Sequence, residues 1–187
     1  MHHTIEILKI EECIDSEYIK PKSMYYLHNN VERRWDVVHT HDSVAILLYH
    51  KSLDSFVFVK QFRPSIYLKN NDGFTYELCA GIVDKQKSLI EIAQEEVLEE
   101  TGYNVSLPNL EKISSFYTAV GFAGGRQTLY YAVIDESMKV SEGGGVECEN
   151  IEVIYLKREE TLAFMFDEKH ATTSGLMFAL MWHFKHH

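Results

Sequence analysis

The sequence is organised around one well-delimited helix, which we predict for residues 88–101. Ser88 and Glu91 have the spacing of a capping box, in which each side chain accepts a hydrogen bond from the backbone of the other residue. Apolar residues then recur at helical spacing, and Gly102 follows at the position where a left-handed residue often ends a helix. Only one face of this helix is apolar, so it must pack against another layer of structure.

Short apolar runs on both sides of this helix predict strands, with further helices near the end of the chain. Two of these runs, at 24–28 and 34–39, alternate like a hairpin pair, with Asn29 and Asn30 as the turn. Mixed strands around one early helix favour an α/β sandwich over a doubly wound sheet. The other expected strands are 43–50, 55–61, 76–80 (ended by Gly81), 112–117, 127–134 and 151–156, and the expected C-terminal helices are 159–166 and 173–184.

Composition excludes several classes of protein. The chain has 45% hydrophobic residues and a net charge of −10, as expected of an ordered globular protein that repels nucleic-acid phosphates. Its longest apolar runs are shorter than the ~20 residues that span a bilayer. Its three cysteines are widely spaced, which indicates reduced thiols. We therefore expect a cytoplasmic protein with neither nucleic acid nor membrane as a partner.

The polar face of the predicted helix is unusually acidic. Like charges three or four residues apart cost roughly 0.2–0.5 kcal/mol per pair, and the end of a helix disfavours anions. A bound hard divalent cation such as Mg²⁺ would explain the arrangement, since carboxylate oxygens are its preferred protein ligands. The alternative is a solvated acidic face on an acidic protein. The four carboxylates belong to Glu95, Glu96, Glu99 and Glu100.

Residues 81–103 resemble the Nudix box, G-x5-E-x7-R-E-U-x-E-E-x-G-U, where U is apolar or aromatic. Two positions depart from it, because Lys87 replaces a glutamate and Glu95 replaces an arginine. This reversal suggests a compensated swap, but eight residues of helix rise about 12 Å, so we do not expect the two side chains to pair directly. The matching residues are Gly81, Glu96, Val97, Glu99, Glu100, Gly102 and Tyr103.

The resemblance covers residues 24–184 and points to the ADP-ribose and UDP-sugar pyrophosphatase branch of this family. ADP-ribose enzymes of the branch usually carry a proline about 15 residues past the box, where this chain has A-V-G at 119–121, so the UDP-sugar type is favoured. Further segments that carry the resemblance are W-D-V-V (35–38), H-D-S-V (41–44), V-K-Q-F-R-P (59–64), E-L-C-A-G (77–81), G-G-R-Q-T (124–128) and G-G-G-V-E-C-E (143–149).

The resemblance implies a Nudix-fold α/β/α sandwich with a mixed sheet and an N-terminal antiparallel strand extension. Residues 1–40 would form the extension, in the interface of a homodimer, and residues 41–187 the hydrolase domain. The implied reaction cleaves the diphosphate of a nucleoside diphosphate sugar, so that UDP-glucose gives UMP and glucose 1-phosphate. Two alternatives are an ADP-ribose pyrophosphatase, giving AMP and ribose 5-phosphate, and a non-catalytic nucleotide-binding module, which would lose the box glutamates retained here.

The resemblance also assigns roles to the acidic residues. Glu96 and Glu100 are the first-choice ligands of Mg²⁺, for which Mn²⁺ could substitute, with Glu99 as the third ligand and the Ala80 carbonyl as a further one. A second acidic pair, Glu147 and Glu149, follows three glycines that we expect to form a flexible loop closing over the substrate. One of this pair would hold or deprotonate the attacking water, and the sequence leaves both candidates open.

Three further side chains are candidates for substrate binding. Arg63 and Arg126 could clamp the diphosphate, because guanidinium pairs bidentately with phosphate oxygens. An ordinary salt bridge is the alternative, about equally expected for Arg63 and less expected for Arg126. Trp35 could stack on the base, although a large aromatic side chain is as often part of a core.

Overall fold

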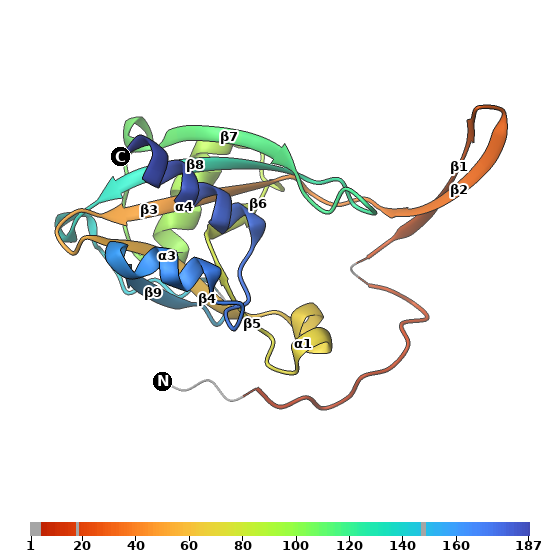
Figure 1. The fold of residues 1–187 in the computed structure, drawn as a ribbon, viewed down its shortest axis with the longest axis horizontal. Helices are drawn as coiled ribbons and strands as arrows, with labels where there is room; N and C mark the ends of the chain where they lie inside the picture. The colour runs from red at the N-terminus through yellow and green to blue at the C-terminus, as the bar shows by residue number, and fades with distance from the viewer. Residues whose placement is uncertain (1–4, 18, 147–148) are drawn as a thin grey trace.

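A computed structural model describes residues 5–17, 19–146 and 149–187. It consists of a rounded body and a two-stranded arm that reaches away from it (Figure 1). The arm pairs β1 (Pro21–His28) with β2 (Val31–Val38) in antiparallel register. Asn29 and Asn30 join them with φ values of 52° and 64°, the left-handed pair that a tight two-residue hairpin requires. The predicted hairpin and its turn are therefore confirmed.

The body is built on a seven-stranded mixed sheet, ordered β5-β4-β3-β8-β7, with β6 paired to β3 and β9 paired to β4. The central pair β3 and β8 is parallel, and the other pairs are antiparallel. The strands are β3 (Ser43–His50), β4 (Ser55–Phe62), β5 (Phe74–Glu77), β6 (Cys79–Ile82), β7 (Glu111–Tyr117), β8 (Arg126–Ile134) and β9 (Glu152–Lys157).

The two central strands β3 and β4 separate as they leave their connecting turn. They pair only over Leu48–His50 and Ser55–Val57; farther along, β6 takes the free edge of β3 and β5 takes that of β4. The prediction of one strand at 76–80 ended by Gly81 was therefore wrong. The chain crosses from one diverging strand to the other at Leu78, which splits the run in two and leaves Gly81 inside β6.

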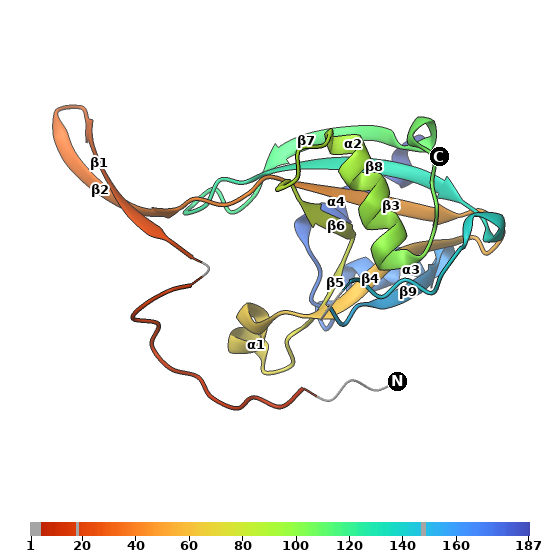
Figure 2. The same ribbon diagram turned by 180° about the vertical axis from the view of Figure 1, so that it is seen from behind.

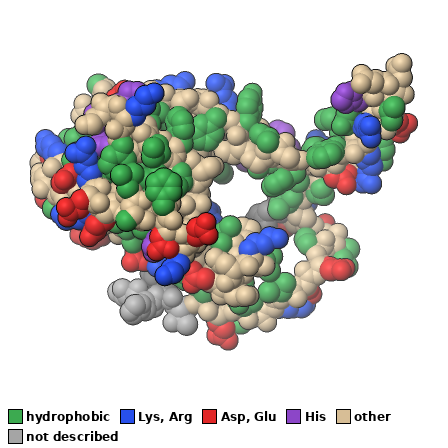
Figure 3. All heavy atoms as spheres, viewed as in Figure 1, with side chains coloured by type: hydrophobic (Ala, Val, Ile, Leu, Met, Phe, Trp, Pro, Cys, Tyr) green, Lys and Arg blue, Asp and Glu red, His purple; other side chains and the backbone are tan. Residues whose placement is uncertain are grey.

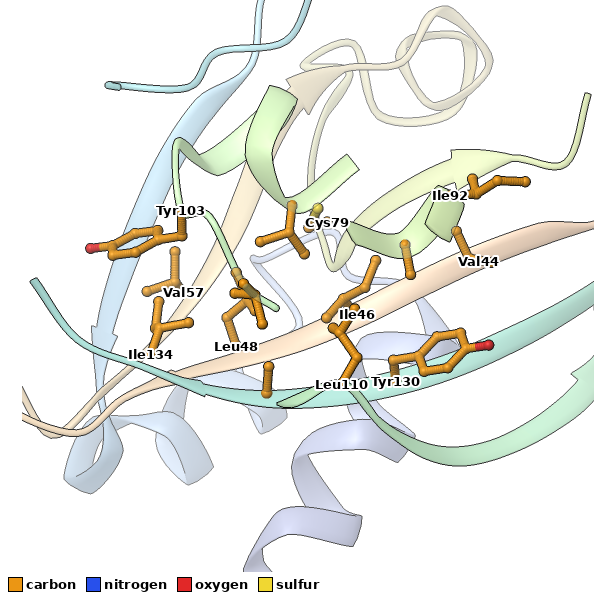
Figure 4. Packing of buried hydrophobic residues seen from close by; sticks show 14 residues of the cluster. Val44, Ile46, Leu48, Val57, Cys79, Ile92, Tyr103, Leu110, Tyr130 and Ile134 are labelled. Atoms are coloured by element: carbon orange, nitrogen blue, oxygen red, sulfur yellow. The ribbon is translucent and has the colours of Figure 1, made fainter. Parts of the chain in front are cut away.

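Helices cover both faces of the sheet. On one face lies α2 (Leu89–Glu96), as Figure 2 shows, and on the other lie α3 (Arg158–Phe166) and α4 (Ser174–His186) (Figure 1). Alternate side chains of β3 supply both cores, because neighbouring residues in a strand point to opposite faces. Thus Ile46 packs on the α2 side, drawn in Figure 4, and Leu47 on the α4 side. The α/β/α sandwich is confirmed.

The structure confirms a helix over the predicted range 88–101, but its last turn is not α-helical. The Ser88 N–H donates to Glu91 Oε2 at 2.8 Å, completing the capping box. The final turn, η1 (Val97–Thr101), is a π-helix, a form that is frequent at functional sites. Gly102 ends it with φ 77°. The sequence analysis did not predict α1 (Pro64–Asn70) or the short 3₁₀ turns η2 (Leu107–Asn109) and η3 (Glu136–Met138).

No helix within the described ranges combines the length and the apolar character that crossing a membrane would require.

Candidate active site

A pocket of about 400 Å³ opens where β3 and β4 separate. The sheet, the turn after β4, the α2–η1 helix and the loop before β9 all contribute side chains to it, so the pocket joins segments that lie far apart in sequence. Five of the predicted site residues line it: Arg63, Ala80, Glu96, Glu100 and Glu149. The pocket also includes Ser43, Gln61, Glu77, Gly81, Ile82 and Gln127.

Glu100 is the most deeply placed of these carboxylates, with 4% of the residue exposed. Burial, and after it the charges of Glu96 and Glu149, raise its pKa to about 8, although its Oε2 accepts a hydrogen bond from the Ala80 N–H at 3.0 Å. Burial and the neighbouring charge of Glu99 also raise the pKa of Glu96. The pocket therefore holds carboxylates that resist simultaneous ionisation, a conflict that a bound cation would relieve.

The donor set fits a hard divalent cation. Its side-chain donors are carboxylate oxygens, the type that Mg²⁺ takes from proteins. Gly81 leaves the space they need, because a Cβ there would lie 2.1 Å from Glu96 Cδ and Oε1. In the described part of the chain, no three His, Cys, Asp or Glu side chains are already gathered closely enough to enclose an ion. Glu99 is half-buried on η1 and does not line the pocket.

The triple-glycine segment is attached directly to the helix that carries the glutamates. The Gly144 N–H donates to the Glu100 carbonyl at 2.8 Å, and the Gly145 N–H donates to the Glu99 carbonyl at 3.0 Å. All three glycines have positive φ, and a Cβ on Gly143 would lie 2.3 Å from the Glu100 carbonyl oxygen. Where we expected a flexible loop, the structure has a closely packed, hydrogen-bonded one, because only glycine allows this approach of two backbones.

Of the two candidate bases, one lies in the described structure. Glu149 lines the pocket, and its Oε2 accepts a hydrogen bond from the Val146 N–H at 3.0 Å. Glu147 lies outside the described residues. Both residues therefore stay candidates for the catalytic base.

Arg63 is held in the pocket by a residue that the sequence analysis did not single out. Glu77 accepts from Arg63 Nε at 2.8 Å and from Nη2 at 2.7 Å, and Thr75 Oγ1 donates to Glu77 Oε1 at 2.5 Å. Burial would raise the pKa of Glu77, but its hydrogen bonds and the charge of Arg63 hold that pKa below its ordinary value. Arg63 therefore forms the salt bridge that was the alternative interpretation, and this ion pair lies inside the pocket. The only sequence signal for Glu77 was its place in the E-L-C-A-G run.

Two predicted substrate residues lie outside this pocket. The Arg126 side chain is exposed, while its backbone N–H donates to Asp42 Oδ1 at 2.9 Å. Trp35, on β2, is 55% exposed and therefore is not a core residue; its Nε1 donates to the Gly121 carbonyl at 2.6 Å. It lines a separate hollow of about 480 Å³ at the base of the arm, together with Phe122.

The two residues that depart from the Nudix box form an ion pair. Lys87 Nζ contacts Glu95 Oε1, and Lys85 Nζ lies 3.5 Å from Glu95 Oε2. Our expectation that they would not pair directly was wrong. Lys87 precedes the Ser88 N-cap, so it is not part of the helical rise, and its segment folds back along α2.

Reversing one charge of this pair should lower the melting temperature slightly, and reversing both should restore it. Lys87→Glu would place two carboxylates together, but both side chains are partly exposed, so we expect a fall of only about 1–2 °C. The double variant Lys87→Glu/Glu95→Lys should regain most of that loss in calorimetry. Additive losses in the double variant would contradict a direct pair, and Lys69→Glu, on exposed α1, is the matched control.

Comparisons with known proteins find relatives that match nearly the whole chain. Uridine diphosphate glucose pyrophosphatase NUDT14 from Bos taurus is 34% identical over 96% of this chain and 94% of its own length. GDP-mannose pyrophosphatase from Pectobacterium atrosepticum is 34% identical over 89% of this chain and 88% of its own. A scan against protein-family models finds no match.

A solved structure described as an ADP compounds hydrolase superposes with a TM-score of 0.65 at 17% identity, covering 95% of this chain and 92% of that one, which supports the fold. The 34% identity to two sugar-nucleotide pyrophosphatases extends over nearly the full length of the chains. Together with the glutamate-lined pocket, it identifies the family. The protein belongs to the Nudix hydrolases, in the branch of nucleoside diphosphate sugar pyrophosphatases.

Proposed function

We propose that the protein hydrolyses UDP-glucose or a close analogue to UMP and glucose 1-phosphate, with Mg²⁺ as its cofactor. The observation that carries this proposal is the single pocket in which Glu96, Glu100 and Glu149 face the same space as Arg63. The name of the bovine relative supports uridine and glucose as the base and sugar. We also propose that the enzyme is cytoplasmic and does not bind nucleic acid, in keeping with its net negative charge and its three widely spaced cysteines.

The box glutamates would hold the metal ion. Glu96 and Glu100 would be its ligands in the pocket. Glu99 and the Ala80 carbonyl would be the other ligands that the protein supplies. A divalent cation in such a site neutralises diphosphate oxygens and lowers the pKa of bound water. The Ala80 N–H keeps the Glu100 carboxylate turned toward the pocket, which favours its charged form when the cation is present.

The remaining steps belong to side chains around the glutamates. Glu149, or Glu147 beside it, would accept the proton of the attacking water. Arg63, held in place by Glu77, would stabilise the negative charge of the diphosphate, and Arg126 would bind the substrate from the neighbouring turn.

A panel of substrates tests this function. We expect kcat/KM for UDP-glucose to exceed that for ADP-ribose at least tenfold in Mg²⁺, and EDTA to abolish turnover of both. Chromatography should show UMP and glucose 1-phosphate as the products. A preference for ADP-ribose would overturn the substrate assignment, and full turnover in EDTA would overturn the role of the metal. GDP-mannose belongs in the panel because of the second relative.

We further propose that the arm, within residues 1–40, joins two copies of the chain. It exposes Met24, Tyr25 and Leu27 as well as Trp35, and Figure 3 shows hydrophobic side chains uncovered along it. A lone two-stranded hairpin is marginally stable in water, so a partner surface would stabilise it. A second copy would also bring Trp35 to the partner's pocket, where it could stack on the base.

Sedimentation should therefore show a dimer of the 21.7 kDa chain. Leu27→Glu places a charge on the exposed arm and should shift the protein toward monomer, with at least a tenfold loss of kcat/KM. The matched control is Leu68→Glu, on exposed α1, which should remain dimeric and active. A fully active wild-type monomer would contradict the proposal.

A further inference from the structure

A second hollow, of about 280 Å³, lies beside the glutamate-lined pocket. The two spaces share Glu77, Ala80 and Gln127 as lining residues. A ligand bound in one space can therefore extend into the other along these three residues. The far side of the second hollow is formed by Thr118, after β7, and by Ser174 at the start of α4. A molecule with its diphosphate at the glutamates could therefore extend one of its ends into this hollow.

The lining of this second hollow differs in chemistry from those of the other two cavities near the site. The hollow at the base of the arm contains the aromatic rings of Trp35 and Phe122, and the glutamate-lined pocket contains Arg63. The described residues that line the second hollow include neither an aromatic side chain nor a lysine or arginine. It thus lacks the flat surface that a base would stack on and the cations that a phosphate would require.

Apart from Glu77, whose charge is paired with Arg63, the second hollow offers neutral hydrogen-bonding groups and an apolar part of its lining. Gln127 Nε2 donates to Ser43 Oγ at 3.3 Å, while its Oε1 receives no hydrogen bond from any residue the structure describes. Ser174 is exposed and lines the hollow, so its hydroxyl is accessible to a ligand there. Ala45 and Leu78 form the apolar part of the lining. This combination suits a sugar, which presents hydroxyls at its rim and C–H groups on its faces.

A buried glycine of α4 determines where Gln127 lies. Gly175 is buried on the first turn of α4, and a Cβ there would lie 2.7 Å from Gln127 Oε1. The absence of a side chain lets α4 approach β8, and it leaves Gln127 at the boundary between the two spaces. The position of the amide is therefore a consequence of how the helix packs on the sheet.

We infer that the second hollow is the subsite for the sugar of the substrate, with Gln127 and Ser174 as hydrogen-bonding partners of its hydroxyls. This inference rests on the proposed function, because it takes the diphosphate to lie at the glutamates. It assigns the specificity for the sugar to the β8–α4 side of the site.

Filling the subsite tests this inference. Ser174→Leu should raise KM for UDP-glucose at least tenfold, and it should raise the inhibition constant of glucose 1-phosphate without changing that of UMP. Hydrolysis of the methyl ester of UDP, which has the base and the diphosphate but no second sugar, should change less than twofold. The smaller Ser174→Ala should have an intermediate effect on UDP-glucose. Ser52→Leu, in the exposed turn at the other end of β3, is the matched control.

The outcomes separate this inference from the proposed function. If wild type hydrolyses UDP-glucose but Ser174→Leu affects UDP-glucose and the methyl ester equally, or affects neither, the sugar subsite is overturned and the function stands. If wild type hydrolyses no nucleoside diphosphate sugar, the proposed function fails first. Calorimetry on Ser174→Leu should show a folded protein, so that a loss of affinity cannot be assigned to unfolding.

Discussion

Glu100→Gln should lower kcat at least tenfold and at the same time make the metal-free protein more stable at pH 8. The tenfold loss corresponds to about 1.4 kcal/mol of activation barrier and follows from removing the charge of a proposed ligand of the cation. The gain in stability follows from the same charge, because the carboxylate is buried near Glu96 and Glu149 and its pKa is raised to about 8. The amide keeps the side chain's size and has no charge to bury.

The sign of the pH dependence follows from that pKa. The ordinary value is 4.5 and the folded value is about 8, so the folded state binds the proton more tightly than the unfolded state does. The associated stability is fully present below pH 4.5 and is lost as the pH rises to 8, by an amount on the order of a few kcal/mol. Added Mg²⁺ should restore part of it at pH 8, since a ligand of the native state stabilises that state.

Urea denaturation in EDTA between pH 4.5 and 9 measures this effect. Wild type should lose stability across this range, and Glu100→Gln should lose much less. Glu160→Gln, on the exposed face of α3, should follow wild type in both stability and turnover. Equal slopes for wild type and Glu100→Gln would show that the buried carboxylate does not set the pH dependence, and unchanged turnover would exclude its role as a metal ligand.

Gly143→Ala should destabilise the protein far more than Gly124→Ala, although both glycines have a left-handed backbone. Their φ values are 71° and 68°, so the intrinsic cost of a side chain is similar, about 1–2 kcal/mol. A Cβ on Gly124 meets no atom within 4 Å, whereas one on Gly143 meets the Glu100 carbonyl oxygen at 2.3 Å. We expect a loss of roughly 3–4 kcal/mol for Gly143→Ala, because backbone atoms cannot rotate away.

The same variant should impair catalysis beyond its effect on folding. Pushing the loop off the helix would move Glu149 away from Glu96 and Glu100, so kcat should fall at least tenfold at temperatures where the variant is still folded. Gly124→Ala should keep wild-type kcat. Equal losses of stability in the two variants would show that the loop yields easily, in contradiction to the packing seen here.

The sequence was most informative where a periodic pattern and a local signal coincided. The Asn29-Asn30 turn and the Ser88 capping box each fix a backbone geometry within a few residues, and both were confirmed. The resemblance assigned Glu96, Glu100 and Arg63 to one site, and all three line the same pocket, while their roles in catalysis stay predictions.

What the sequence could not provide depends on tertiary contacts. The break at Leu78 reflects the separation of β3 and β4, which no local pattern records. The Lys87–Glu95 pair depends on the path of a short segment before the helix, and Glu77 gains its role only because Arg63 comes from the end of another strand. Trp35 and Arg126 lie outside the glutamate-lined pocket within one chain, so their assigned roles require a second copy or a bound substrate.

The hydrogen bonds from Gly144 and Gly145 to the carbonyls of Glu100 and Glu99 have a consequence for how such an enzyme can change over evolution. They fix the spacing between the triple-glycine segment, which precedes the proposed base, and the helix that carries the carboxylates. Substitutions of side chains elsewhere can therefore accumulate without altering that spacing, whereas inserting or deleting a single residue between 140 and 145 would shift it by a whole residue. Length variation should accordingly be tolerated in an exposed turn such as 51–54 long before it is tolerated here.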